Sequence, residues 1–123
     1  MVWCMSSCAA SSNLEDYNRT IYSPHYAIGF SIMGAEGKQS TLIRVTNPWQ
    51  SANEVETMLF IARGGEKAPD GFRGQVLQGD AERVVCMSST HIAMLDAIGV
   101  IESVVGVSGK DFITNPYIVA NQH

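Results

Sequence analysis

The feature that most constrains the fold is a stretch of 25 residues, 83–107, in which the hydrophobic pattern changes twice. Residues 83–87 form a short continuous apolar run, typical of a strand buried on both faces. Serine and threonine residues then precede a helical pattern over residues 91–98, and Gly99 follows it, as expected at the two ends of a helix. Residues 104–107 are again short and apolar. The order predicts a β-α-β unit with parallel strands and a right-handed crossover. Three apolar residues of this helix have the spacing that places them on one face, which we expect to press on the sheet. They are Met94, Leu95 and Ile98.

Before this unit, strand patterns alternate with turn residues. Residues 26–32 and 41–46 alternate apolar and polar side chains, and a glycine-containing segment lies between them, so an antiparallel hairpin is predicted. Its first strand would carry Ile28, Phe30 and Ile32 on one side. Residues 58–62 form a third strand candidate, and residues 75–77 a short further one.

Composition excludes some classes of function. The chain has 123 residues and 46% hydrophobic content, which suits one globular domain. Its net charge is -4, and its eight Lys and Arg residues are scattered, so we expect no nucleic-acid partner. The three histidines lie far apart, and the sequence contains no Cys-x-x-Cys, His-Glu-x-x-His or Gly-x-Ser-x-Gly motif. We therefore expect neither an enzyme nor a metal site.

The N-terminal residues point to a membrane anchor. Met5-Ser6-Ser7-Cys8 resembles the end of a lipoprotein signal peptide, in which small residues precede the cysteine that receives the lipid. We expect residues 1–23 to be the remnant of such a signal followed by a polar linker, with the true start of the reading frame further upstream and Cys8 as the lipidation site. The alternative is an N-terminus with incidental cysteines. Cys86, inside an apolar run, is expected to be a core residue.

Polar residues gather where the two parallel strands end. In an open α/β sheet, ligands lie outside the C-terminal ends of the strands. Hydroxyl groups and backbone N–H groups at a helix start favour an anionic group. The alternatives are that the serines only cap the helix and that the second segment is only a turn. The candidate ligand-binding residues are Ser88, Ser89, Thr90, Ser108, Lys110 and Asp111.

The same stretch resembles a known family. Residues 83–99, RVVCMSSTHIAMLDAIG, followed by VVGVS at 104–108, are similar to the opening of the periplasmic binding proteins that serve iron-siderophore, haem and cobalamin importers. Residues 26–30 and 47–50 resemble the N-terminal extension of lipoprotein members from gut Bacteroidetes. The resemblance covers about residues 22–123. It implies an α/β fold: residues 24–123 would form the Rossmann-like N-terminal lobe of a two-lobed protein, with an antiparallel β-hairpin as the N-terminal extension.

The resemblance also implies a function. The chain would be the solute-binding component of an ABC importer, a periplasmic lipoprotein that delivers an iron-siderophore, haem or cobalamin to an inner-membrane permease and holds no cofactor of its own. We expect it to stop before the second lobe, so that one wall of the ligand cleft is missing. The alternative is a lipid-anchored interaction module that docks a partner without transport. An exposed aromatic patch for such docking would be formed by Tyr22, His25, Trp49 and Phe72.

Overall fold

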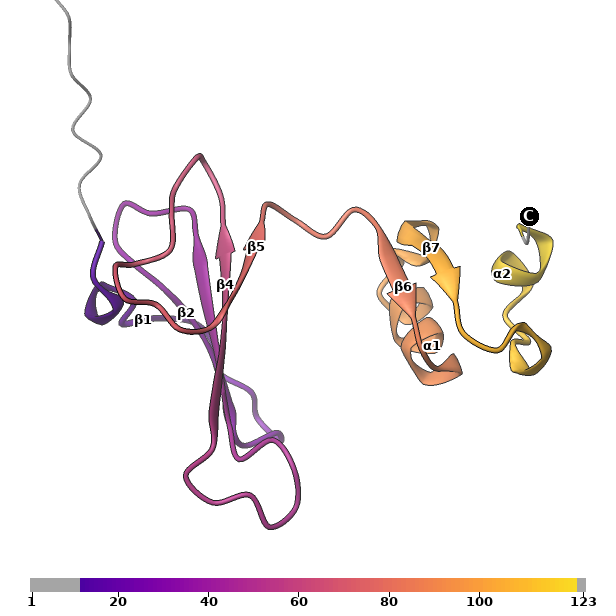
Figure 1. Ribbon diagram of the computed structural model, residues 1–123, viewed down its shortest axis with the longest axis horizontal. Helices are drawn as coiled ribbons and strands as arrows, with labels where there is room; N and C mark the ends of the chain where they lie inside the picture. The colour runs from indigo at the N-terminus through magenta and orange to yellow at the C-terminus, as the bar shows by residue number, and fades with distance from the viewer. Residues whose placement is uncertain (1–11, 122–123) are drawn as a thin grey trace, which may run out of the picture. The chain divides into compact units, whose positions relative to one another are not determined.

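The computed structural model describes residues 12–121, and the chain divides into two compact units after Asp80 (Figure 1). Each unit has its own cluster of buried side chains. Within residues 12–121, no helix has both the length and the apolar content needed to cross a bilayer. The two units are described separately below.

The first unit is a five-stranded sheet in which the strand order follows the chain order. Successive strands are antiparallel from β1 to β4, and β5 lies parallel to β4 at the edge. The elements are the 3-10 helix η1 (Leu14–Asp16), β1 (Arg19–Tyr22), β2 (Phe30–Gly34), β3 (Thr41–Thr46), β4 (Glu56–Ala62) and β5 (Gln75–Gln78).

The core of the first unit lies on one face of this sheet. Leu42 on β3 and Phe60 on β4 are direct cross-strand partners, and both are fully buried. Tyr17 meets Phe60 edge-on, with ring centroids 5.3 Å apart, and Phe72 from the β4–β5 connection approaches the same ring at 5.8 Å. Three aromatic rings from distant parts of the sequence therefore close one side of the sheet. Such pairs stabilise beyond the area that they bury.

The predicted hairpin forms between β2 and β3, but its first strand is shorter than expected. Pairing begins at Phe30, opposite Val45. Gly29 has φ +91, and an added Cβ would lie 2.8 Å from the Thr46 carbonyl oxygen, so only glycine fits there. This backbone conformation ends the strand. Ile28, expected on the strand face beside Phe30, instead lies in the β1–β2 loop and is 97% exposed.

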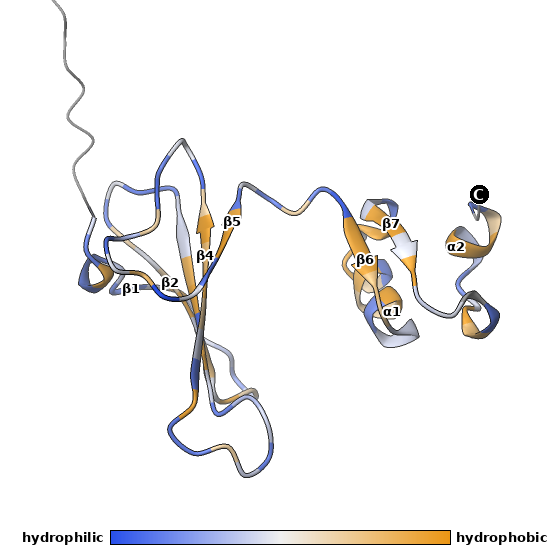
Figure 2. Cartoon of the chain, in the orientation of Figure 1, coloured by the Kyte–Doolittle hydropathy of each residue, from blue (hydrophilic) through white to orange (hydrophobic). Residues whose placement is uncertain are grey.

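The second unit contains the predicted β-α-β arrangement. Two strands pair in parallel, and the helix α1 lies between them in sequence. Figure 2 shows hydrophobic residues concentrated on β6 and on parts of α1 and β7. The elements are β6 (Val84–Cys86), α1 (Ser89–Ala97), η2 (Ile101–Ser103), β7 (Val104–Val107), η3 (Lys110–Phe112) and α2 (Pro116–Ala120).

The helix α1 packs with a different face from the one expected. Ile92 is its only buried residue, and Leu95 is half-buried. Met94 and Ile98 are 61% and 71% exposed, so the prediction that they press on the sheet was wrong for these two residues. Ile92 and Leu95 are three residues apart and share one helix face. Ile92 belongs to the buried core of this unit, and Leu95 packs against that core. Its buried members are Cys86, Ile92, Ile113 and Ile118. The prediction that Cys86 is a core residue is confirmed, and its thiol is free.

The predicted fold class was wrong. The structure is mostly β: a five-stranded mixed sheet dominates, the second unit has only two strands, and residues 12–121 contain only two α-helices. It is not a Rossmann-like α/β lobe. The β-α-β pattern is confined to residues 83–107, whereas residues 19–62 form an antiparallel meander. Residues 13–23, expected to be a polar linker, contain η1 and the edge strand β1, because β1 finds a hydrogen-bonding partner in β2.

Candidate functional site

The two strand ends that carry the candidate site residues lie side by side in the second unit. Cys86, the last residue of β6, is the register partner of Val107, the last residue of β7. Beyond them, the Ser108 N–H donates to the Cys86 carbonyl oxygen at 2.9 Å. Because the strands are parallel, the turns that begin at Ser88 and at Ser108 leave the same edge of the sheet.

On the β6 side of this edge, the candidate residues form the start of α1. Ser88 is the N-cap: its backbone is extended, and its Oγ accepts a hydrogen bond from the Thr90 N–H at 3.1 Å. Its own carbonyl oxygen accepts from the His91 N–H at 3.1 Å. Ser88 is half-buried, whereas Ser89 and Thr90 are exposed. The capping role of Ser88 is thus established, and the ligand-binding role of this segment stays a prediction.

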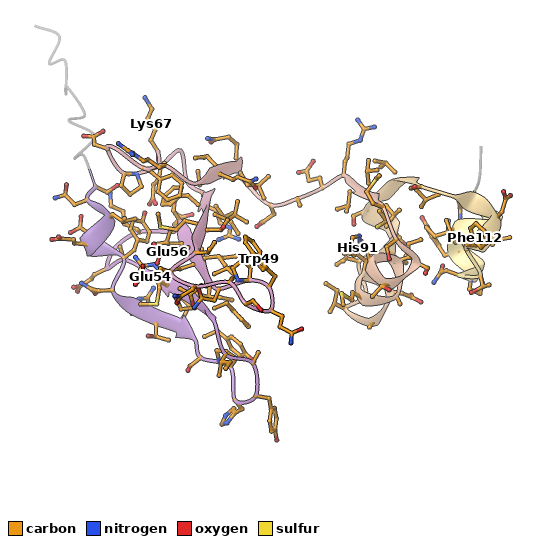
Figure 3. The ribbon with its side chains drawn as sticks, turned by 60° about the horizontal axis from the view of Figure 1, so that its bottom comes forward. Trp49, Glu54, Glu56, Lys67, His91 and Phe112 are labelled. Carbon is orange, nitrogen blue, oxygen red and sulfur yellow. The ribbon has the colours of Figure 1, made fainter. Side chains whose placement is uncertain are left out.

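On the β7 side, the candidate residues lead into the short helix η3. Ser108 and Asp111 are exposed, and Lys110 begins η3. Sequence reasoning missed Phe112, whose ring is 83% exposed although its N–H is bonded to the Gly109 carbonyl oxygen at 3.2 Å. Figure 3 labels Phe112 and His91 in this unit. The only sequence signal for Phe112 is its place in the segment that follows β7. It adds an exposed apolar side chain to the segment that follows β7.

An open groove of about 480 Å³ runs along α1. It begins at Ser89, a candidate site residue, and is otherwise made of residues that sequence reasoning did not single out. Across it, Asn115 donates to Asp96 Oδ2 at 2.9 Å, and its Oδ1 accepts from the N–H groups of Tyr117 and Ile118 at the start of α2. The lining residues are Ser89, Ile92, Ala93, Asp96, Ala97, Ile113, Thr114, Asn115 and Pro116.

A second polar cluster lies in the first unit, where the β2–β3 turn meets the end of β4. The Glu66 carboxylate accepts hydrogen bonds from the backbone N–H groups of Gln39 at 3.0 Å and Ser40 at 3.1 Å. Burial raises the pKa of Glu66, but hydrogen bonds from the Ser40 side chain and from these two backbone N–H groups, together with the charge of Lys38, outweigh it, so the pKa is lower than usual. The carboxylate therefore fastens the turn.

The same cluster continues along the strand ends through Arg63. Its guanidinium donates to Asp80, with the closest approach at 2.6 Å, and to Thr41 Oγ1 at 2.9 Å. Its backbone N–H donates to the buried Ser40 hydroxyl. Each of these groups makes a hydrogen bond that holds a neighbouring segment in place. We call the cluster of Glu66, Arg63 and their partners the clamp, because its contacts fit a structural role better than a reactive site.

Tyr17 is the least satisfied group near this clamp. Its hydroxyl is buried and makes no hydrogen bond of good geometry within residues 12–121. Burial raises the pKa of Tyr17, and the negative charge of Glu66 raises it further. Both effects favour the neutral phenol over the phenolate.

Cys8, the expected lipidation site, lies outside the described residues. Among residues 12–121, no group of three or more His, Cys, Asp or Glu side chains is arranged to hold a metal ion. Of the expected aromatic patch, Tyr22, His25 and Trp49 are exposed, whereas Phe72 packs against the core.

Comparisons with known proteins add no further likeness: no family model matches the chain, and neither a curated protein nor a solved structure matches it.

Proposed function

We propose that the second unit provides part of the solute-binding site of an ABC importer's binding protein, and that the solute is a metal chelate: an iron-siderophore, haem or a cobalamin. The class of protein and of solute comes from the resemblance of residues 83–108 to these binding proteins, and the structural observation that supports the proposal is the junction of β6 and β7. The Ser108 N–H to Cys86 carbonyl bond brings the turns at Ser88 and Ser108 to one edge. The ABC permease as partner, and a periplasmic location with a lipid on Cys8, belong to the same proposal.

The chemistry of this edge suits such a solute. Ser89, Thr90 and Ser108 offer exposed hydroxyl groups that can donate to the oxygen atoms of a chelate or to a carboxylate. Phe112 offers an exposed ring that can lie against a planar or aromatic ligand. These groups lie on one side of the solute only. Since binding sites for small molecules bury most of the ligand surface, we expect this edge alone to bind weakly.

The test is an NMR titration of the isotope-labelled chain with diamagnetic probes. A gallium(III) tris-catecholate, a gallium(III) trihydroxamate, a zinc porphyrin and cyanocobalamin represent the ligand classes. At least one should shift the amide signals of residues 88–90 and 108–112. Ser108→Ala should weaken that interaction, whereas Ser51→Ala, which removes an exposed hydroxyl in the first unit, should not. Shifts confined to other residues, or none with any probe at millimolar concentration, would rule the proposal out.

A further inference from the structure

Two neighbouring loops of the first unit carry apolar side chains that project into solvent. One loop, residues 23–29, joins β1 to β2, and the other, residues 47–55, joins β3 to β4. Tyr26 is 100% exposed, Ile28 is 97% exposed and Trp49 is 61% exposed. We call these three residues the apolar tip. Single exposed apolar residues are common on protein surfaces, but the tip has two almost fully exposed side chains in one loop and a largely exposed tryptophan in the neighbouring loop.

The bases of the two loops are joined by hydrogen bonds. The Thr46 N–H donates to the Gly29 carbonyl oxygen at 2.6 Å. The second loop is closed at its base, where the Asn47 N–H donates to the Val55 carbonyl oxygen at 2.7 Å and the Val55 N–H donates to Asn47 Oδ1 at 3.1 Å. Both loops extend beyond the same end of the sheet, as the purple and magenta bends in Figure 1 show. These hydrogen bonds fix the bases of the two loops that carry the tip.

The composition of the loops indicates which surface the tip fits. Residues 23–29 and 47–53 contain no Lys, Arg, Asp or Glu. Tyr and Trp collect at membrane–water interfaces, where the ring enters the apolar boundary and the polar atom stays at the headgroups. Without basic residues, the loops have no electrostatic preference for anionic lipids. Figure 3 labels Trp49 on its loop, and Glu54, the first acidic residue, stands at the end of the same loop.

We propose that the apolar tip inserts into the interface of a zwitterionic phospholipid bilayer. A bilayer accepts projecting side chains from two separate loops because its headgroup region deforms around them. A protein partner would need a preformed hollow that fits side chains from both loops and polar groups at its rim, whereas residues 23–29 and 47–53 offer no Lys, Arg, Asp or Glu side chain to pair with them. Insertion of the tip depends neither on a lipid at Cys8 nor on solute binding by the second unit.

The experiment uses the full chain with Trp3→Phe, so that Trp49 is the only tryptophan. On addition of phosphatidylcholine vesicles, the Trp49 emission should move to shorter wavelength, and brominated acyl chains should quench it. Tyr26→Ser with Ile28→Ser should lower the partition coefficient about tenfold, because two apolar side chains no longer leave water. As the matched control, Met94→Ser with Ile98→Ser removes two exposed apolar side chains of α1 and should leave the partition unchanged.

Three results would overturn the proposal. The first is an absence of quenching of Trp49 by brominated lipid. The second is an equal loss of vesicle binding in the tip variant and in the control variant. The third is an emission shift that grows with protein concentration in the absence of vesicles, which would assign the tip to association between copies of the chain. The tip variant and the control variant change exposed residues, and circular dichroism checks that every protein used remains folded.

Discussion

At the scale of single residues, Glu66 illustrates how one side chain replaces missing backbone pairing. Gln39 and Ser40 follow the β2–β3 turn, where Gln39 is exposed and Ser40 is buried, and a buried backbone N–H needs an acceptor. The Glu66 carboxylate supplies two oxygen atoms for them, 26 and 27 residues further along the chain. Hydrogen bonds to a charged acceptor are stronger than neutral ones. A surface glutamate thereby becomes part of the fold.

Glu66 should make the stability of the first unit depend on pH. Its folded-state pKa is lower than the ordinary value of 4.5. The unfolded chain therefore takes up the proton first, and the stabilisation is present above pH 4.5 and lost as the pH falls through the folded-state pKa. Glu66→Gln should cost about 1 kcal/mol at pH 7 and progressively less in acid. Urea unfolding between pH 7 and pH 3 measures this difference.

The control for Glu66 is Glu36→Gln, which removes one negative charge from an exposed position in the β2–β3 turn. A similar pH dependence in both variants would mean that net charge, and not the clamp on Gln39 and Ser40, is responsible.

At the scale of elements, the ends of the two α-helices are defined by capping groups. Ser88 caps the start of α1, and Gly99, with φ +74, follows its end, where the Val100 N–H bonds to the Leu95 carbonyl oxygen. For α2, which has only five residues, the cap matters more, because a helix this short is not stable by itself. Asn115 provides that cap and also bonds to Asp96 on α1. It therefore joins the two helices.

Asn115→Ala should loosen α2 and destabilise the second unit by about 1 to 2 kcal/mol, since it removes an N-cap and a side-chain link to α1. Amide hydrogen exchange of Tyr117 and Ile118, followed by NMR, should become faster. Asn121→Ala is the matched control, because it removes an asparagine at the other end of α2 whose side chain donates to the Tyr117 carbonyl oxygen and does not cap the start of the helix. Equal exchange rates in both variants would contradict the capping role.

At the scale of the whole molecule, the important observation is that there are two cores. One core contains Phe60 and Leu42, and the other contains Cys86 and Ile92. Each cluster is built from residues of its own unit, on either side of the boundary after Asp80. Units with separate cores can unfold separately, so that a single free energy of unfolding does not describe the chain.

We predict that core substitutions act on one unit at a time. Phe60→Ala removes a side chain with no exposed surface and should cost about 3 to 5 kcal/mol in the first unit. Ile92→Ala should cost about 2 to 5 kcal/mol in the second. Hydrogen exchange by mass spectrometry should show lost protection in residues 30–62 for the former and in residues 84–107 for the latter. Loss of protection in both regions from either substitution would show that the units unfold together.

The amino-acid sequence by itself determined the features that depend on near neighbours. The β6–α1–β7 order, the cap at Ser88, the glycine after α1, the burial of Cys86 and the β2–β3 pairing all follow from hydrophobic period and local backbone preference, which act within a few residues. The sequence also indicated that polar groups gather after β6 and β7, because parallel strands end at the same edge. The resemblance of residues 83–108 implied an α/β fold for residues 24–123, and that prediction was wrong because the β-α-β pattern is local to the second unit.

Only the tertiary structure decided what depends on contacts between distant residues. Tyr17 lies in a polar stretch, and its burial against Phe60 cannot be read from its neighbours. The end of β2 at Gly29 also depends on a distant residue, because the Gly29 carbonyl oxygen accepts a hydrogen bond from the Thr46 N–H. The position of β5 likewise depends on its parallel pairing with β4. In each case, the free energy gained from a distant partner outweighs the local preference of the segment.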